Sequence, residues 1–391
     1  MKAKYAAAVA ISFVLITATV IYGVVKWEPT KAESLGVFVG VDAAYDNPEE
    51  IKTLLDATSP YTNLFIIGST GVTNNETKLN AMCQYVYDKG LSFIVYTEMP
   101  PQIGRAWIEH AKSLWGDRFL GLYVYDEAGG KQVDLFENQG MQRYPVKEAD
   151  NYTDARNQFI ATLNASLNWV VWNFTNEDVQ LFSSDYALYW FDYKGGYDTL
   201  FAEFRGNYSK QMNVAFCRGA GEAQNKDWGV MITHTYAVEP RLESPDKLYE
   251  DMVLAYENGA KYIVIFDTNI NYTHGTLGEE TNFTQTLGGQ YLQTLKQFTE
   301  YAHKNPRTSE RANERTAFVL PKDFAYGFRG PTDKIWGLWE ADSFSYDISV
   351  QLGSLLEQYG GKLDVIYDDG INYSTLGYSR FIFWNGTVLN G

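Results

Sequence analysis

Cysteine and histidine are scarce in this chain, which excludes several common kinds of protein. Only Cys83 and Cys217 occur, so the chain is not a small secreted module held together by disulfides, and two thiols cannot build a structural zinc site. The four histidines are scattered, and neither HExxH nor CxxC spacing occurs. An EF-hand loop is also missing. We therefore expect no metal centre and no cofactor.

Motifs that bind phosphate groups or build a serine nucleophile are missing too. Gly129-Gly130 is followed by neither GK[ST] nor a GxGxxG fingerprint, and no GxSxG elbow occurs. Positive charge is in short supply: the formal net charge is -16, and Lys and Arg form no cluster, which argues against a nucleic-acid partner. By elimination, the chemistry that this chain offers is that of carboxylates.

The composition is that of a globular protein, with 45% hydrophobic and 20% charged residues in 391 positions. This length allows one large domain and a smaller one. Aromatic residues are frequent at 16%, including 29 Tyr and 10 Trp. Such residues either stack on sugars or fill a core with a polar tip, and the composition leaves both roles open.

One long hydrophobic run stands at the N-terminus, where residues 5–25 contain no charge and follow Lys2 and Lys4. About 20 apolar residues span a bilayer as a helix, so we predict a transmembrane signal anchor and a linker over residues 1–35. Lysines before the run hold the N-terminus inside and send the remainder out. Cleavage after the small residues near Ala18, which would give a secreted protein, is the alternative.

Nine Asn-X-Ser/Thr acceptor sequons support this placement on the extracellular side of the membrane. They begin at Asn75, Asn151, Asn164, Asn173, Asn207, Asn271, Asn282, Asn372 and Asn385. Extracellular animal proteins usually carry more disulfides, so the two cysteines favour a prokaryotic protein, and the sequons favour an archaeal one.

Eight apolar runs, most of them followed by a helical pattern, occupy residues 36–304. The expected strands are residues 36–42, 63–70, 91–100, 119–130, 179–184, 198–204, 228–236 and 261–269. Helix starts are marked by Asn47-Pro48 and Ser244-Pro245, because Asn or Ser caps a helix and Pro suits its first turn. Residues 185–193 predict a short aromatic helix, with a strand as the alternative. Eight strand-helix units predict a (β/α)8 TIM barrel.

A smaller unit follows the barrel. Residues 305–315 are a polar linker, and residues 316–391 predict a small α/β unit of order βαββ. Its strands are expected at residues 316–321, 362–369 and 380–386, with a helix over residues 346–358. The unit is too short to fold comfortably alone, so we expect it to pack on the barrel.

The fourth strand, within FLGLYVYDEAGG (residues 119–130), carries the first candidate for chemistry. Strand side chains alternate between two faces, so Tyr123, Tyr125 and Glu127 share one face and the aliphatic residues share the other. If the aliphatic face packs on the helices, Glu127 points inward at the carboxyl end of the strand, where TIM barrels keep their active sites. Neighbouring Asp126 and the tyrosines are expected to raise the pKa of Glu127 into the range of an acid catalyst.

Other carboxylates stand at or just after predicted strand ends. Glycosidic bond cleavage needs one protonated and one ionised carboxyl group across the bond. We predict Glu127 as the acid/base, Glu203 as the nucleophile or base, and Glu239 as the second choice for that role. The residues predicted to bind substrate are Asp42, Glu98, Tyr125, Asp126, Trp190, Tyr193, His234, Tyr236 and Asp267.

Structural roles stand beside these functional ones. Asp42, Asp126 and Asp267 also suit helix caps, and Glu203 also suits an ion pair with Arg205 or Arg218. Cys83 and Cys217 fall on the second and sixth predicted helices, so we expect two separate buried thiols.

The sequence YDE at the fourth strand, the aromatic-rich loops and the small α/β unit resemble the superfamily of TIM-barrel glycoside hydrolases, over residues 36–304. The resemblance implies an acid/base at the end of strand four, here Glu127. Two departures leave the nucleophile open: Asp126 stands where Asn is usual, and strand seven, WGVMITHTY, lacks a terminal Glu. The C-terminal unit is similar to shortened amidotransferase-like domains without their catalytic Cys.

The resemblance implies a cell-surface enzyme that hydrolyses glycosidic bonds of an extracellular or envelope polysaccharide. The alternative is a non-catalytic glycan-binding or cell-surface structural protein on the same scaffold, which predicts no carboxylate partner for Glu127 within about 10 Å. A third interpretation is an enzyme that acts on another polymer, such as a peptide or a lipid-linked saccharide.

Overall fold

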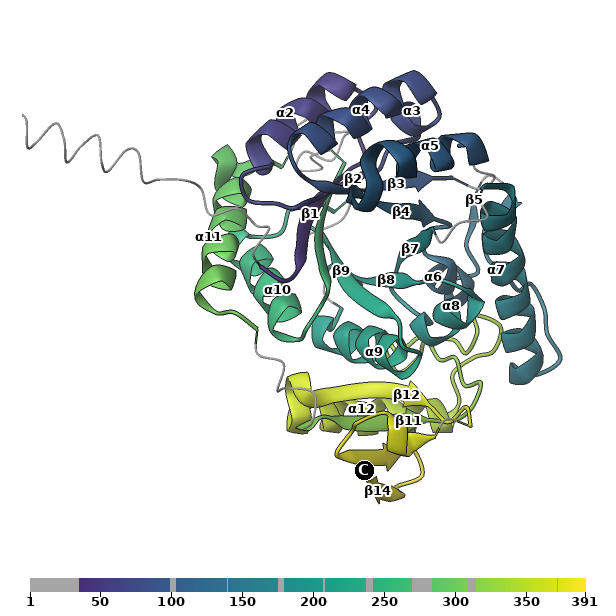
Figure 1. Cartoon of the computed structure of the whole chain (residues 1–391). Coiled ribbons are helices and arrows are strands. Elements are labelled where there is room, and N and C mark those ends of the chain that lie inside the picture. The colour runs from purple at the N-terminus through teal and green to yellow at the C-terminus, as the bar shows by residue number, and fades with distance from the viewer. Residues whose placement is uncertain are drawn as a thin grey trace, which may run out of the picture.

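A computed structural model describes residues 35–98, 103–138, 140–174, 179–206, 208–236, 242–268, 283–307, 314–370 and 372–391. Eight parallel strands close into a barrel in the order β1-β10-β9-β8-β7-β4-β3-β2. Helices surround this barrel, and a smaller unit, drawn in yellow, lies against one side of it (Figure 1). The predicted TIM barrel followed by a small α/β unit is therefore confirmed.

Each predicted barrel strand has a counterpart in the structure. The strands are β1 (Phe38–Ala43), β2 (Leu64–Ile67), β3 (Ser92–Thr97), β4 (Phe119–Val124), β7 (Gln180–Asp185), β8 (Thr199–Phe204), β9 (Asp227–Thr233) and β10 (Tyr262–Asp267). The aromatic segment that left two alternatives open forms a helix, α8 (Tyr189–Gly195). Strand β8 is therefore the sixth barrel strand, as predicted.

The barrel helices begin where the sequence places capping residues. Asn47 caps α2 (Pro48–Thr58) by accepting the Glu49 N–H, and Ser244 caps α10 (Pro245–Glu257). The remaining helices are α3 (Thr70–Thr73), α4 (Glu76–Asp88), α5 (Arg105–Trp115), α6 (Ala128–Val133), α7 (Tyr152–Phe174), α9 (Lys210–Ala223) and α11 (Gln290–Lys304). A two-stranded ribbon of β5 (Glu137–Asn138) and β6 (Met141–Gln142) lies between α6 and α7.

Side chains fill the inside of the barrel, so it is a core and not a pore. The interior cluster consists of Leu64, Ile66, Ile94, Tyr123, Phe182, Phe201, Met231, Tyr262 and Val264. A larger cluster packs the outer faces of the strands against the helices. Any binding site must therefore lie at an end of the barrel.

The C-terminal unit is a four-stranded sheet of order β12-β11-β13-β14 with one helix. Its elements are β11 (Thr316–Leu320), α12 (Ser343–Tyr359), β12 (Leu363–Tyr367), β13 (Arg380–Phe383) and β14 (Val388–Asn390). Strand β14 was not predicted. It pairs antiparallel with β13 across Asn385-Gly386, a dipeptide typical of tight hairpins.

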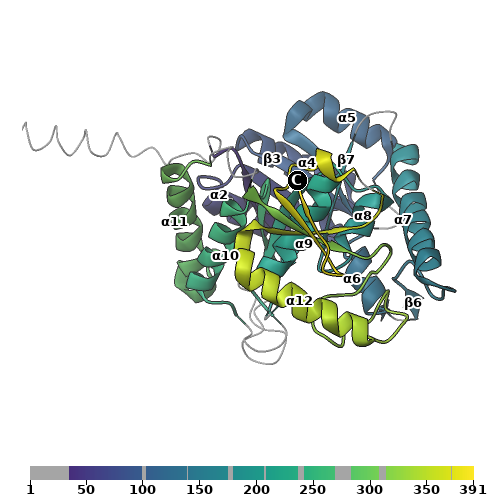
Figure 2. The ribbon, with the colours of Figure 1, turned by 90° about the horizontal axis from the view of Figure 1, so that it is seen from below.

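The unit packs on the barrel through α9, as expected for a fold too small to stand alone. Helix α9 contacts β12, which is an edge strand of the sheet, and α12 runs beside the sheet (Figure 2). Arg218 of α9 is 3% exposed and donates to Asp364 Oδ1 over 2.6 Å and to the carbonyl oxygens of Gly361 and Leu363. Gly219 leaves no room for a Cβ, which would stand 2.4 Å from the Val365 carbonyl oxygen.

The predicted anchor, residues 5–25, lies outside the described residues. Within the described ranges, no helix is both long and apolar enough to span a bilayer. Asn75, Asn151, Asn164, Asn372 and Asn385 are exposed, whereas Asn207, Asn271 and Asn282 lie outside the described residues and the Asn173 side chain is not described. Cys83 and Cys217 are buried free thiols on α4 and α9, as predicted.

Candidate functional site

A cavity of about 800 Å³ opens at the carboxyl ends of the barrel strands. A volume of this size suits a ligand larger than a single small molecule fragment. Its wall contains the carboxyl groups of Asp42, Asp46, Asp126, Glu127 and Glu203. Arg205, Ser69, Thr70, Ser184, Thr233 and Thr235 add further polar groups, and Tyr96, Tyr123, Tyr208, Met231, Tyr236 and Phe266 add apolar surface.

Glu127 reaches this cavity through a turn and not through strand alternation. Strand β4 ends at Val124, and both Tyr125 (φ 50°) and Glu127 (φ 54°) take the left-handed conformation that non-glycine residues avoid. The Glu127 N–H donates to the Ser184 carbonyl oxygen over 3.0 Å, which ties the turn to β7. The predicted alternation beyond Val124 is therefore wrong: Asp126 lines the cavity, whereas Tyr125 does not.

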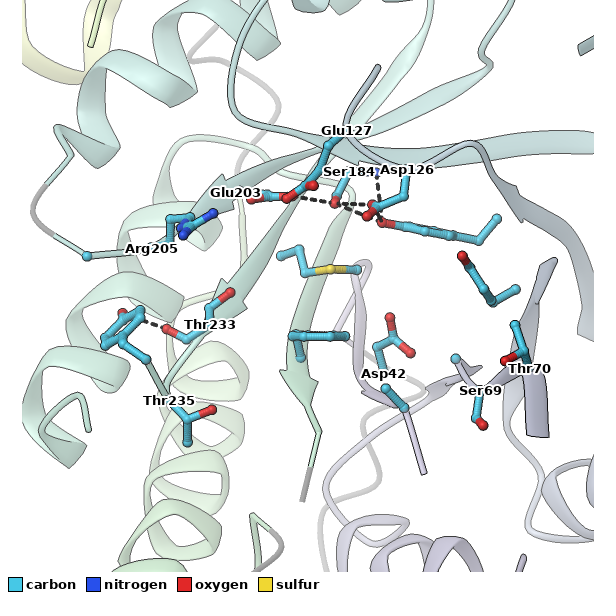
Figure 3. A pocket seen from close by; sticks show the side chains of 18 of the residues that line it. Asp42, Ser69, Thr70, Asp126, Glu127, Ser184, Glu203, Arg205, Thr233 and Thr235 are labelled. Carbon is cyan, nitrogen blue, oxygen red and sulfur yellow. Dashed lines mark hydrogen bonds between the residues drawn. The ribbon is translucent and has the colours of Figure 1, made fainter. Parts of the chain in front are cut away.

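Glu203, near the end of β8, lies beside Glu127, and the two carboxyl groups adjoin in the cavity wall (Figure 3). Its side chain is 7% exposed, and the Ser184 hydroxyl lies 2.7 Å from its Oε1 atom. The predicted ion pair with an arginine does not form among the described residues, because Arg218 binds Asp364 instead. The alternative of a non-catalytic glycan-binding or structural protein predicts no carboxylate partner near Glu127. The position of Glu203 contradicts that prediction.

The pKa values of the two carboxyl groups are raised to different extents. Burial raises the pKa of Glu203 well above its usual range, and the charges of Glu127 and Asp126 raise it further. Burial also raises the pKa of Glu127, as does Asp126, but the Lys131 ammonium 3.1 Å away limits this rise. Glu203 is therefore the member of the pair that holds a proton more readily.

Asp126 anchors the next part of the wall. Its Oδ1 atom lies 2.5 Å from the Tyr123 hydroxyl and 3.1 Å from the Ser184 hydroxyl, and the Lys131 ammonium lies 3.6 Å from its Oδ2 atom. Ser184 therefore lies between Asp126 and Glu203 and orients both (Figure 3). Ser184 and Lys131 were not predicted from the sequence. Lys131 follows Glu127 by four residues, the spacing at which side chains meet on a helix.

Asp42 stands at the end of β1, apart from the other acids (Figure 3). It is 4% exposed, and its Oδ1 atom has no hydrogen-bond partner among the described residues. Gly68 makes room for it, since a Cβ there would lie 2.0 Å from Oδ1. Burial raises the pKa of Asp42, and Asp126 and Asp267 raise it further. Asp42 can therefore receive a polar group of a ligand, and its role in binding stays a prediction.

Several other residues predicted to bind substrate lie outside the cavity wall. Trp190 and Tyr193 are buried in α8, where Trp190 packs against Tyr367 and the Tyr193 hydroxyl donates to the Asp227 carbonyl oxygen over 2.6 Å. Trp190 and Tyr193 therefore do not line the cavity, and the tyrosines that do are Tyr96, Tyr123, Tyr208 and Tyr236.

The remaining predicted residues also lie elsewhere. His234 is 1% exposed and packs edge-to-face on Phe283 and Tyr291. Asp267 accepts the Phe283 N–H over 2.7 Å and the Tyr45 hydroxyl, and so stabilises the chain beyond β10. Glu98 is exposed and accepts from the Asn74 amide. Glu239 lies outside the described residues.

In the described part of the chain, no group of three or more His, Cys, Asp and Glu side chains has the arrangement that holds a metal ion. Asp126 and Glu203 instead accept from hydroxyl groups, and Asp126 and Glu127 lie beside the Lys131 ammonium. Such a set of a protonated and an ionised carboxyl group is suited to proton transfer and nucleophilic attack.

No protein-family model and no curated protein matches the chain. Among solved structures, it is similar to GH5_18 from Streptomyces cattleya in complex with GlcNAc, at 11% identity over 90% of this chain and 99% of that chain, with a TM-score of 0.52. It is also similar to the GH99 endo-alpha-mannosidase from Bacteroides thetaiotaomicron, at 12% identity over 67% and 82% of the two chains, with a TM-score of 0.39. At such identities the likeness shows the fold alone, which is a TIM barrel.

Proposed function

We propose that this protein hydrolyses glycosidic bonds of a polysaccharide or another glycan, with Glu127 and Glu203 as its catalytic pair. One observation carries the proposal: the carboxyl groups of Glu127, in the turn after β4, and of Glu203, near the end of β8, adjoin in the wall of the cavity, and the pKa of Glu203 is raised further, so that one group can be protonated while the other is ionised. Glycosidic cleavage requires that combination. The barrel likeness to GH5_18 agrees with it at the level of fold.

The environment of each carboxyl group assigns its role. Glu203, buried and protonated, donates its proton to the leaving oxygen as the glycosidic bond breaks, while ionised Glu127 attacks the anomeric carbon. Glu203 then takes a proton from water, and that water displaces Glu127 from the sugar. These roles are the reverse of those predicted from the sequence, because Lys131 favours the charged form of Glu127 and burial disfavours that of Glu203.

The contact between the two groups favours a retaining mechanism. Retaining enzymes hold their carboxyl groups about 5 to 5.5 Å apart, whereas inverting enzymes leave about 6.5 to 9.5 Å for a water molecule. In the free site the Glu127 and Glu203 carboxyl groups adjoin and each influences the pKa of the other, which favours the shorter separation.

Around the pair, the cavity binds sugar by stacking and by hydrogen bonds. Tyr236 and Tyr208 offer aromatic surface, and Asp42 offers a polar contact from β1. The volume of about 800 Å³ accommodates more than one sugar unit, which suits a polymeric substrate.

The proposal extends to the cell surface. Residues 5–25 anchor the protein in the membrane of a prokaryotic, and by its sequons archaeal, cell, and the barrel acts on an extracellular or envelope polysaccharide. The exposure of Asn75, Asn151 and three further sequon asparagines is what N-glycan attachment requires. Mass spectrometry of the protein from its native membrane tests the anchor and the N-glycans together.

The test of the activity is a screen of the full chain against soluble polysaccharides and aryl glycosides, with E127Q and E203Q beside the wild type. We expect release of reducing ends by the wild type and a loss of at least about 10³-fold in both variants, as removal of a residue that acts in the transition state requires. E357Q, an exposed glutamate change on α12, is the control and retains full activity. Equal activity in wild type and E127Q contradicts the proposal.

A further inference from the structure

Beneath Glu127 lies a second pair of acids that does not line the cavity. Asp185 ends β7 and Asp192 belongs to α8, and both are buried, with 1% and 0% exposure. The two carboxyl groups are close enough for Asp185 to raise the pKa of Asp192 beyond the effect of burial, and neither Asp192 oxygen has a hydrogen-bond partner among the described residues. Burying two carboxyl groups lowers the stability of a folded protein, so the position of this pair needs an explanation.

The Asp185 carboxylate is held by four backbone N–H groups. Two belong to its own turn, from Tyr186 at 2.7 Å and Ala187 at 3.0 Å. The other two come from Gly129 at 2.6 Å and Gly130 at 2.7 Å, in the first turn of α6. Asp185 therefore links β7 to the segment that directly follows Glu127.

The two glycines explain why this link is so close. A Cβ on Gly129 would lie 2.5 Å from the Ala187 carbonyl oxygen and 3.0 Å from an Asp192 oxygen. A Cβ on Gly130 would lie 2.2 Å from the Tyr186 ring. Gly129-Gly130, which matches no phosphate-binding motif, thus allows the first turn of α6 to pack directly on β7 and α8.

The segment held in this way carries strain. Tyr125 and Glu127 both have positive φ angles, which non-glycine residues adopt only where the surroundings enforce them. On one side of Glu127 the chain is fixed by its N–H on the Ser184 carbonyl oxygen, and on the other by Asp185 through Gly129 and Gly130. Without the second fixed point, the turn can relax and carry the Glu127 carboxyl away from Glu203.

We infer that Asp185 is a positioning residue for Glu127, with the Asp192 carboxyl as its proton-donating partner, an inference that rests on the proposed function. Asp192 donates to Asp185 and so allows a charged carboxylate to remain buried beneath α6. Burial raises the pKa of Asp185 to about 7, and the N–H groups of Ala187, Gly129 and Gly130 oppose this rise and so favour its charged form. The pair acts through the backbone of residues 127–130 and touches no substrate.

The test compares D185N, D192A and D192N in the full chain. In D185N the side-chain amide turns an N–H group toward backbone donors, so Gly129 or Gly130 loses its acceptor. We expect kcat to fall on the order of 100-fold with KM within about twofold of the wild type, because a displacement of about 1 Å costs that much. The kcat of D192A should fall by a similar factor. D192N should keep most of the wild-type kcat, because its amide donates to Asp185 as the protonated acid does.

D198N is the matched control, because Asp198 also accepts a strand N–H, that of Leu181 at 3.0 Å, but at the opposite end of β7. It should lose stability and keep kcat. The inference is overturned if D185N keeps its kcat, or if D185N and D198N lose kcat in the same proportion to their loss of stability.

If the wild type hydrolyses no glycan, the proposed function fails, but a crystal structure of D185N still decides the positioning. A Glu127 carboxyl displaced from Glu203 supports the inference, and an unchanged contact overturns it.

Discussion

Replacing Glu203 by glutamine should make the protein more stable, and increasingly so as the pH rises. Glutamine keeps the shape of the protonated acid, can accept from Ser184 as Glu203 does over 2.7 Å, and can donate to Glu127. Unlike Glu203, the glutamine does not have to take up a proton when the protein folds. Because burial and the charges of Glu127 and Asp126 raise the pKa of Glu203, the folded wild type must retain a proton that the unfolded chain releases.

The magnitude follows from proton linkage. Below the unfolded pKa of about 4.3, both states bind the proton and Glu203 has no effect on the pH dependence of stability. Above it, the folded state loses about 1.4 kcal/mol of relative stability per pH unit, until the pH reaches the raised pKa of folded Glu203. The advantage of E203Q over the wild type therefore grows by about 1.4 kcal/mol for each pH unit in this interval.

Urea denaturation of both proteins at pH 4, 5, 6 and 7 measures this difference. The midpoints should coincide near pH 4 and separate as the pH rises, with equal slopes against urea concentration. E357Q on the exposed face of α12 serves as the control and should follow the wild type at every pH. If E203Q gains stability by the same amount at every pH, or if it loses stability, Glu203 does not hold a proton in the folded protein.

Two further changes test other parts of the structure. R218L removes the guanidinium that joins α9 to the C-terminal unit and leaves Asp364 buried with only Arg315 as a charged partner, so we expect a loss of about 3 to 5 kcal/mol of unfolding free energy. Calorimetry measures it, and a change below about 1 kcal/mol would count against this interface. K131M removes the charge that lowers the pKa of Glu127, so the acidic limb of the pH-rate profile should move to higher pH. An unmoved limb would show that Glu127 does not titrate there.

The barrel could be predicted from the sequence because its determinants are local. Apolar runs bounded by turn residues mark each strand, and Asn47 or Ser244 marks the start of a helix by its side chain. Counting such units needs no knowledge of the contacts between them. The missed strand β14 is only three residues long, and it forms only because β13 lies beside it.

For the candidate site, the sequence predicts which residues stand at the strand ends but not how their side chains are oriented. Glu127 and Glu203 were identified because both stand at or just after the carboxyl end of an apolar strand. The orientation of Asp126 was missed, because the positive φ angles of Tyr125 and Glu127 end the alternation of β4. That turn depends on Asp185, which is distant in the sequence.

The aromatic lining of the cavity could be predicted only in part: Tyr236 lines the cavity, whereas Trp190 and Tyr193 do not. Trp190 and Tyr193 have the composition of a sugar-binding surface, but α8 packs them against β12 and the neighbouring strands. Whether an aromatic side chain faces a cavity or a neighbouring helix is decided by packing, since the same residue type serves both roles.

The most direct test of the catalytic pair is to trap the sugar on the enzyme. The best substrate from the screen, made as a 2-fluoro glycoside with a reactive leaving group, is incubated with the wild type, and the peptide that carries the sugar is identified by mass spectrometry. We predict a covalent adduct on Glu127, and none in E127Q. An adduct on Glu203 would contradict the assigned roles, and turnover without any adduct, with inversion at the anomeric carbon, would contradict the retaining mechanism.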